Sequence, residues 1–145
     1  MQLPSRIQER FRAYGRAGGR ARAASMSPSA RRTAARRAVL QRWISARFGG
    51  PSFAALGLPG GEIIDAGLSS LCAGEETVES LLVSLAAPRL KREGVPLPRE
   101  LFPDADERLY RLLDDSGSGL AHAQYLAYCR QAASFADGCA NARVT

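Results

Sequence analysis

Residues 77–87 read TVESLLVSLAA, the most clearly periodic stretch of this 145-residue chain. Val78, Leu81, Leu82 and Leu85 recur every three or four residues, which places them on one face of an α-helix. The same helical spacing of apolar residues occurs in three further segments: residues 59–71, 103–115 and about 120–137. No β-branched run alternates with polar residues as a strand would. The sequence therefore predicts an all-α class with a small bundle of about four helices.

Two details of these helices follow from residue type. Pro88 is expected to kink or end the helix that begins at Thr77, because proline lacks an amide hydrogen and clashes with the preceding turn. The helix over 103–115 is expected to bury Ala105, Leu109, Leu112 and Leu113.

The formal net charge of +6 is unevenly distributed along the chain. Residues 1–50 contain twelve arginines and a single acid, Glu9, for a net charge of +11. Residues 51–145 contain eight cations and thirteen acids, for a net charge of −5. Such an asymmetry is typical of a polyanion-binding arm joined to a body with a different task.

The basic segment is predicted to form a helix-turn-helix-like arm. A first helix has an apolar face made by Leu3, Ile7, Phe11 and Tyr14. A turn is expected at the glycines that follow, Gly15, Gly18 and Gly19. Ser27 and Pro28 suit the N-cap and first turn of a second helix, expected from Ala30 to about Phe48. Its apolar stripe is expected to consist of Ala35, Val39, Trp43 and Ala46.

These patterns divide the chain into three parts. Residues 1–48 form the arginine-rich arm, and residues 49–58 form a linker that starts with the helix-breaking Gly49-Gly50-Pro51. Residues 59–145 form an acidic helical body, which is expected to bind a protein partner or to form a homodimer.

Arginine offers phosphate a planar fork of donors, and phosphate neutralisation releases counterions. The arm is therefore expected to bind nucleic acid, with DNA as the expected form and the second helix suited to a major groove. The expected contact residues are Arg16, Arg20, Arg22, Arg31, Arg32, Arg36, Arg37 and Arg42, together with Gly18 and Gly19. The two glycines would let backbone N–H groups approach a phosphate closely.

Trp43 has two interpretations. An indole attracts guanidinium groups and stacks on bases, as aromatic residues do in single-strand sites. Its position on the predicted apolar stripe instead favours a core residue that docks the helix on the body, and this is the expected role.

The acids of the body concentrate around the helix over 103–115, and the expected partner-binding residues are Asp104, Glu107, Asp114 and Asp115. Asp104 lies at the start of this helix, where a negative charge is stabilised by the helix macrodipole. Asp114 and Asp115 lie at its C-terminal end, where the macrodipole disfavours a negative charge. We hypothesise that this acidic surface binds a basic surface, including the protein's own arm, and so competes with nucleic acid for the arginines.

Catalytic and metal-binding patterns are not found. His122, Cys72, Cys129 and Cys139 lack zinc-site spacing. His122 and Cys129 lie two helical turns apart, without an orienting third group. Phosphate-loop and nucleophile-elbow motifs are missing as well. We therefore expect no enzyme, no cofactor and no metal; a small enzyme using Asp114, Asp115 or His122 is the minor alternative.

The reducing cytoplasm is the expected location. Three widely spaced cysteines do not describe a disulfide framework. The sequence shows no apolar segment of membrane-spanning length and no secretory signal. An arginine-rich, acid-poor N-terminal segment also fits an organelle transit peptide. The paired glycines and the proline-capped second helix instead favour a folded part of the protein over a removable presequence.

The basic segment resembles a module of many small bacterial proteins over about residues 14–48. The shared features are GGRARA at residues 18–23, the Ser27-Pro28 cap and Arg42-Trp43. Met26 stands where leucine is commoner in that module. Some of these proteins are antitoxin-like components encoded beside nucleotidyltransferase-type toxins. The resemblance implies a bacterial antitoxin or autoregulator, with a DNA-contacting N-terminus and a helical body that holds such a toxin.

Taken together, the sequence predicts a non-enzymatic nucleic-acid-binding protein of this antitoxin-like kind. The alternative is a protein–protein interaction module, whose arginine arm grips an acidic partner such as a toxin without touching nucleic acid.

Overall fold

The helix predicted from residues 77–87 is the centre of the fold in a computed structural model that describes residues 4–142. This helix, α4, covers Val78–Arg92. Thr77 Oγ1 accepts the Ser80 N–H at 3.1 Å, and Ser80 Oγ accepts the Thr77 N–H at 2.7 Å. This reciprocal capping box satisfies donors that a helix start leaves open. The helix continues through Pro88 to Arg92, so of the two outcomes expected at this proline, an end of the helix does not occur. Leu90 is fully buried beyond the proline, and its packing offsets the missing backbone hydrogen bond.

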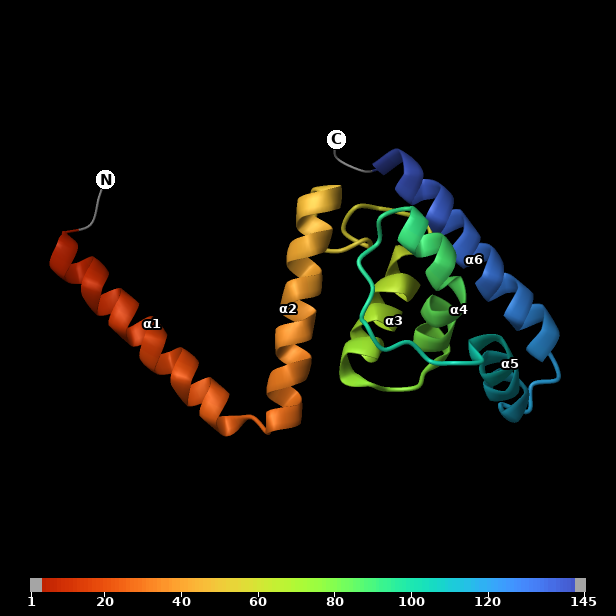
Figure 1. Cartoon of the computed structure of the whole chain (residues 1–145), viewed down its shortest axis with the longest axis horizontal. Coiled ribbons are helices and arrows are strands. Elements are labelled where there is room, and N and C mark those ends of the chain that lie inside the picture. The colour runs from red at the N-terminus through yellow and green to blue at the C-terminus, as the bar shows by residue number, and fades with distance from the viewer. Residues whose placement is uncertain (1–3, 143–145) are drawn as a thin grey trace. The chain divides into compact units, whose positions relative to one another are not determined.

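Helices α3, α5 and α6 surround α4 (Figure 1). The six helices of the described residues are α1 (Ser5–Ser25), α2 (Pro28–Phe48), α3 (Gly61–Ala73), α4, α5 (Ala105–Asp115) and α6 (Ala121–Ala142). α4 packs against α3, α5 and α6, and α5 also packs against α6. No strand occurs within residues 4–142, which confirms the predicted all-α class for that part of the chain.

The chain divides into two units between Ala35 and Arg36, within α2. The first unit contains α1 and the start of α2. The second contains the remainder of α2 and all later helices. The C-terminal half of α2 belongs to the second unit because Ile44 and Phe48 are buried in its core. This unit therefore begins inside the segment that the sequence analysis assigned to the arm.

Residues 49–58, expected to be a linker, contribute to this core. Phe53 is completely buried, and its ring packs edge-on against Phe48 at 5.1 Å and against Phe135 at 4.9 Å between ring centroids. The Asp65 carboxylate of α3 accepts the N–H groups of Phe53 and Ala54 at 3.1 and 2.8 Å. A chain of aromatic rings and a carboxylate thus fix this segment on the body.

The periodic residues mostly occupy the predicted core. Ala105, Leu109 and Leu113 of α5 are buried, as predicted. Leu112 was expected beside them but is 38% exposed. Leu112 lies just outside the face of α5 that packs on α4 and α6. The helical spacing alone therefore predicted a buried stripe that was too wide.

Close packing of α3 on α4 requires a glycine at position 67. A Cβ atom there would lie 2.4 Å from the Glu79 carbonyl oxygen and 2.5 Å from Val83 Cγ2. The helix backbones can approach this closely because Gly67 has no side chain.

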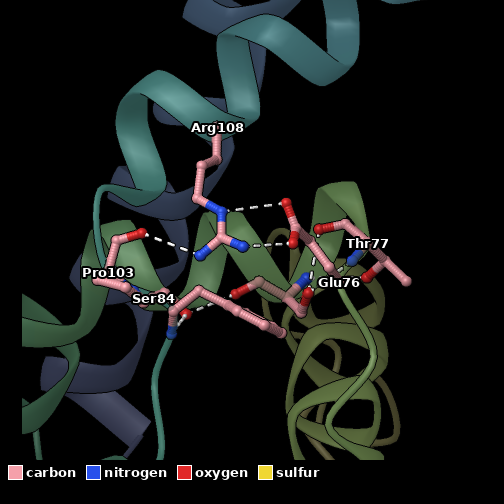
Figure 2. Close-up of polar contacts among 7 residues, drawn as sticks. Glu76, Thr77, Ser84, Pro103 and Arg108 are labelled. Carbon is pink, nitrogen blue, oxygen red and sulfur yellow. Dashed lines mark hydrogen bonds and ion pairs between the residues drawn. The ribbon is translucent and has the colours of Figure 1, made fainter.

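Polar contacts hold α5 on the loop between α3 and α4, and Figure 2 shows Arg108 reaching from α5 to Glu76. The Arg108 guanidinium donates from Nε at 3.2 Å and from Nη2 at 2.7 Å to the two Glu76 carboxylate oxygens. It also donates to the Pro103 carbonyl at 3.4 Å. Ser84 Oγ accepts the Phe102 N–H at 3.1 Å, which fixes the connector that enters α5.

Candidate nucleic-acid interface

Helix α1 has no buried residue, and most of its length carries arginines. Ile7, Phe11 and Tyr14 share one face, and Phe11 and Tyr14 are 64% and 66% exposed. Leu3, predicted to belong to the same face, lies outside the described residues. A separate arginine stripe at i, i+4 and i+8 comprises Arg12, Arg16 and Arg20. The helix is therefore amphipathic, with its apolar and cationic sides both open to a ligand.

The predicted turn at the glycines of α1 was wrong. Gly15, Gly18 and Gly19 lie inside one continuous helix, which ends at Ser25, and the break occurs at Met26-Ser27. In the middle of a helix each N–H donates to a carbonyl four residues earlier. The N–H groups of Gly18 and Gly19 are thus occupied by the helix, which leaves their expected role as phosphate donors without support in this conformation.

The start of α2 agrees with the sequence prediction. Ser27 Oγ accepts the Ala30 N–H at 3.1 Å, and Pro28 is the first helical residue. Arg31 and Arg32, on the first turns after this cap, are exposed.

Helix α2 docks on the body through a different face from the one predicted. The contacting residues are Leu40, Ile44 and Phe48, spaced at i, i+4 and i+8. Val39 and Trp43 of the predicted stripe are 42% and 52% exposed, so the expectation that Trp43 is a core residue was wrong. Alanine and arginine line several sides of this helix, and the sequence therefore marked its buried side poorly.

Two arginines of α2 bind carbonyl oxygens of the body. Arg37 Nη2 donates to the Ser69 carbonyl of α3 at 3.2 Å. Arg47 Nη1 donates to the Gly94 carbonyl after α4 at 2.8 Å. Arg37, expected to contact nucleic acid, thus has a docking role in this structure. Arg47 was not among the residues predicted to bind a partner or nucleic acid, although its i+4 spacing from Trp43 was a usable signal.

The remaining arginines of the basic segment are distinguished by the lack of internal partners. Within residues 4–142, no ion pair or hydrogen bond involves the guanidinium groups of Arg6, Arg10, Arg12, Arg16, Arg20, Arg22, Arg31, Arg32, Arg36 and Arg42. All of these residues are exposed. In the body, by contrast, half of the described arginines form ion pairs: Arg89 with Asp137, Arg108 with Glu76 and Arg111 with Glu107, whereas Arg92, Arg99 and Arg130 form none. The unpaired positive charge is therefore concentrated on α1 and α2.

The predicted acidic surface is only partly brought together. Glu107 and Asp114 line an open cavity of about 580 Å³ together with Asp106, Tyr110, Arg111, His122 and Tyr125. Asp104 and Asp115 are exposed but do not line it. The Tyr110 ring lies 6.3 Å from His122 and 5.8 Å from Tyr125 between centroids. The acids thus share this cavity with aromatic rings, and the combination could not be predicted from the sequence because it joins residues of α5 and α6.

Among the described residues, His122 and Cys129 line two different cavities. His122 lies beside Tyr110, whereas Cys129 interacts with Tyr125 and lines an apolar cavity between α4 and α6. Burial raises the pKa of the Cys72 thiol, with Arg37 and Arg36 opposing the shift less strongly. Among the described residues, no group of three or more His, Cys, Asp or Glu side chains is arranged to hold a metal ion.

A membrane span was also sought within residues 4–142, and none of the helices there combines the necessary length and apolar character.

No family model, curated protein or solved structure matches the chain.

Proposed function

We propose that this protein binds nucleic acid through the exposed arginines of α1 and α2. The observation that carries the proposal is the set of ten guanidinium groups without an internal partner among residues 4–142, set against the body, where three of the six described arginines form ion pairs. Unpaired arginines on two helices cost stability through mutual repulsion unless a polyanion neutralises them. Phosphate groups at regular spacing supply that neutralisation.

The contacts are assigned to the side chains that remain available in the structure. These are Arg16, Arg20, Arg22, Arg31, Arg32, Arg36 and Arg42. Arg37 is assigned to docking of α2, since its guanidinium already binds the Ser69 carbonyl. Contacts of this kind give affinity and register but little base discrimination.

The test is the salt dependence of binding, measured by fluorescence anisotropy with labelled duplex, single-stranded DNA and RNA. Binding through phosphates should weaken steeply with salt, with a logarithmic slope of about −0.9 per phosphate neutralised on duplex DNA. Replacing Arg32 and Arg36 by alanine should reduce the slope by about two. The matched control replaces Arg92 and Arg99, two exposed arginines of the body, and should leave the slope unchanged.

Two results would contradict the proposal. One is the lack of binding to all three nucleic acids at about 50 mM salt. The other is an equal decrease of the salt slope in the Arg32/Arg36 and Arg92/Arg99 variants, which would mean that binding depends only on the net charge of the protein.

A second candidate function rests on the apolar face of α1. Ile7, Phe11 and Tyr14 are exposed at i, i+4 and i+7, the spacing by which amphipathic helices enter a groove on a partner protein. In this alternative the arm grips an acidic protein and no nucleic acid. The antitoxin-like role with a toxin partner is a special case that combines both functions, and it rests on the sequence resemblance. Replacing Phe11 and Tyr14 by alanine should abolish such a complex while leaving the salt slope for nucleic acid intact.

A further inference from the structure

One exposed face of α2 carries an indole between arginines. Trp43, the only tryptophan of the chain, is 52% exposed. Val39 precedes it by one helical turn, Arg36 by two, and Arg47 follows by one, so the four side chains share a face. This face adjoins the Leu40–Ile44–Phe48 side that packs on the body, about a quarter turn around the helix. All four residues belong to the second unit of the chain.

Arg47 is held in place against the indole. Its guanidinium carbon lies 5.1 Å from the centre of the Trp43 ring, within the range of a cation–π interaction. The same guanidinium donates from Nη1 to the Gly94 carbonyl at 2.8 Å. The body thus fixes the arginine, and the arginine in turn restricts the indole. A ligand that stacks on this pair meets a surface that is already ordered, which lowers the entropy lost on binding.

The surroundings of the pair are cationic. Helix α2 contains no acidic residue, and Arg36 and Arg42 near the indole form no ion pair within the described residues. A ligand for this face therefore combines negative charge with a flat apolar surface.

The arrangement of the side chains distinguishes among anionic ligands with a flat apolar surface. A helix that lies in a lipid interface, or that enters an apolar groove, separates its apolar residues from its charged ones. On this face of α2, by contrast, Val39 and Trp43 lie between Arg36 and Arg47, so apolar and cationic groups are not separated. An aromatic ring beside cationic groups is typical of single-stranded nucleic-acid sites, where bases stack on rings and arginines contact the phosphates.

We propose that Trp43 and Arg47 form a stacking site for an unpaired base, with Arg36 and Arg42 on the adjoining phosphates. The inference rests on the proposed nucleic-acid-binding function and specifies its ligand as single-stranded nucleic acid. Duplex bases present only their edges in the grooves, so their faces cannot stack on the indole. The arginines of α1 contact either form through phosphate, whereas the Trp43 site adds affinity for the single strand alone.

The experiment uses the intact chain and the fluorescence of its single tryptophan. An oligothymidylate of about 16 nucleotides is compared with a duplex of equal length. Stacking on the indole should quench Trp43 emission with the oligothymidylate and leave it nearly unchanged with the duplex. Trp43→Ala should weaken single-strand binding by about 5- to 150-fold, and duplex binding by less than about twofold. Trp43→Phe, which retains a stacking surface, should recover most of the affinity.

Tyr110→Ala is the matched control, since Tyr110 is a comparably exposed ring on α5. It should change neither affinity. Circular dichroism verifies that each variant folds, as expected for side chains outside the core.

The outcomes separate this inference from the function on which it rests. Salt-dependent binding of both nucleic acids with no loss in Trp43→Ala, or with an equal loss for both, would overturn the stacking site and keep the proposed function. Failure to bind either one would overturn both. A blue shift of Trp43 emission with anionic phosphatidylglycerol vesicles, without quenching by the oligothymidylate, would assign the face to a lipid surface and overturn the inference.

Discussion

Arg108 of α5 donates two hydrogen bonds, of 3.2 and 2.7 Å, to the carboxylate of Glu76 in the α3–α4 loop, 32 residues earlier in the sequence. The side chains are 33% and 39% exposed, so solvent screens the pair partly. The same guanidinium lies 5.3 Å from the centre of the Phe102 ring. One arginine therefore joins the loop, the connector and α5. It stabilises the fold through its planar fork of hydrogen-bond donors as well as through its charge.

A double-mutant cycle tests this contact. Arg108→Ala, Glu76→Ala and the double variant should give a coupling free energy of about 0.5–1 kcal/mol in chemical denaturation. Arg108→Ala alone should cost more than Glu76→Ala, because it also loses the Pro103 and Phe102 contacts. Arg108→Lys keeps the charge but lacks the fork, and it should recover only part of the stability. Strict additivity of the two single variants would contradict a direct interaction in solution.

Glycines of α3 and α1 should respond in opposite ways to alanine. Gly67→Ala introduces a Cβ atom 2.4 Å from the Glu79 carbonyl and should destabilise the body by about 1–3 kcal/mol. Gly18→Ala meets no atom within 4 Å and should stabilise α1 by about 0.5–1 kcal/mol through helix propensity. Denaturation measures the first change and circular dichroism the second. A Gly18→Ala variant with less helix would show that α1 is not a continuous helix.

Phe53 tests whether the segment after α2 is part of the body. It is fully buried between Phe48 and Phe135, so Phe53→Ala should cost about 3–5 kcal/mol. Pro51→Ala, at an exposed position two residues earlier, is the control and should have little effect. Equal stability of the two variants would support the original assignment of a free linker.

The acidic surface should compete with nucleic acid for the arginines. Reversing Asp114 and Asp115 to lysine should tighten nucleic-acid binding at low salt. The control reverses Glu62 and Glu75, two other exposed acids, and adds the same net charge elsewhere. An unchanged affinity in the Asp114/Asp115 variant, or an equal gain in both variants, would dismiss competition by this particular surface.

Cys72 should make stability depend on alkaline pH. Burial raises the pKa of its thiol, so the unfolded chain loses the proton at lower pH than the folded one. The stability that the buried, protonated thiol contributes is fully present below the thiol pKa of the unfolded chain, which is about 8.5. It is lost as the pH rises through the higher thiol pKa of the folded protein. The unfolding free energy of the wild type should therefore fall toward that of Cys72→Ala above that pH. Cys129→Ala serves as the control, and a pH-independent difference would contradict the shift.

The sequence was informative wherever a helix had one strongly apolar face. The stripes in residues 77–87 and at Leu109 and Leu113 correctly identified helices and their buried sides, because burying leucines on one side of a 3.6-residue period dominates the energetics. The Ser27-Pro28 start of α2 was predictable as well, since capping is local chemistry. The glycines of α1 misled, because a single glycine disfavours a helix by only about 1 kcal/mol and does not dictate a turn.

The sequence by itself determined the helical class and the concentration of arginine before residue 50. Both follow from residue type and spacing along one chain. Only the tertiary structure decided which arginines are occupied and which side of α2 faces outward. Val39 and Trp43 formed as plausible a buried stripe as Ile44 and Phe48. The choice depended on Phe53, Phe135 and other residues distant in sequence that provide the complementary surface. Burial is a property of two packed elements, and a periodic pattern describes only one of them.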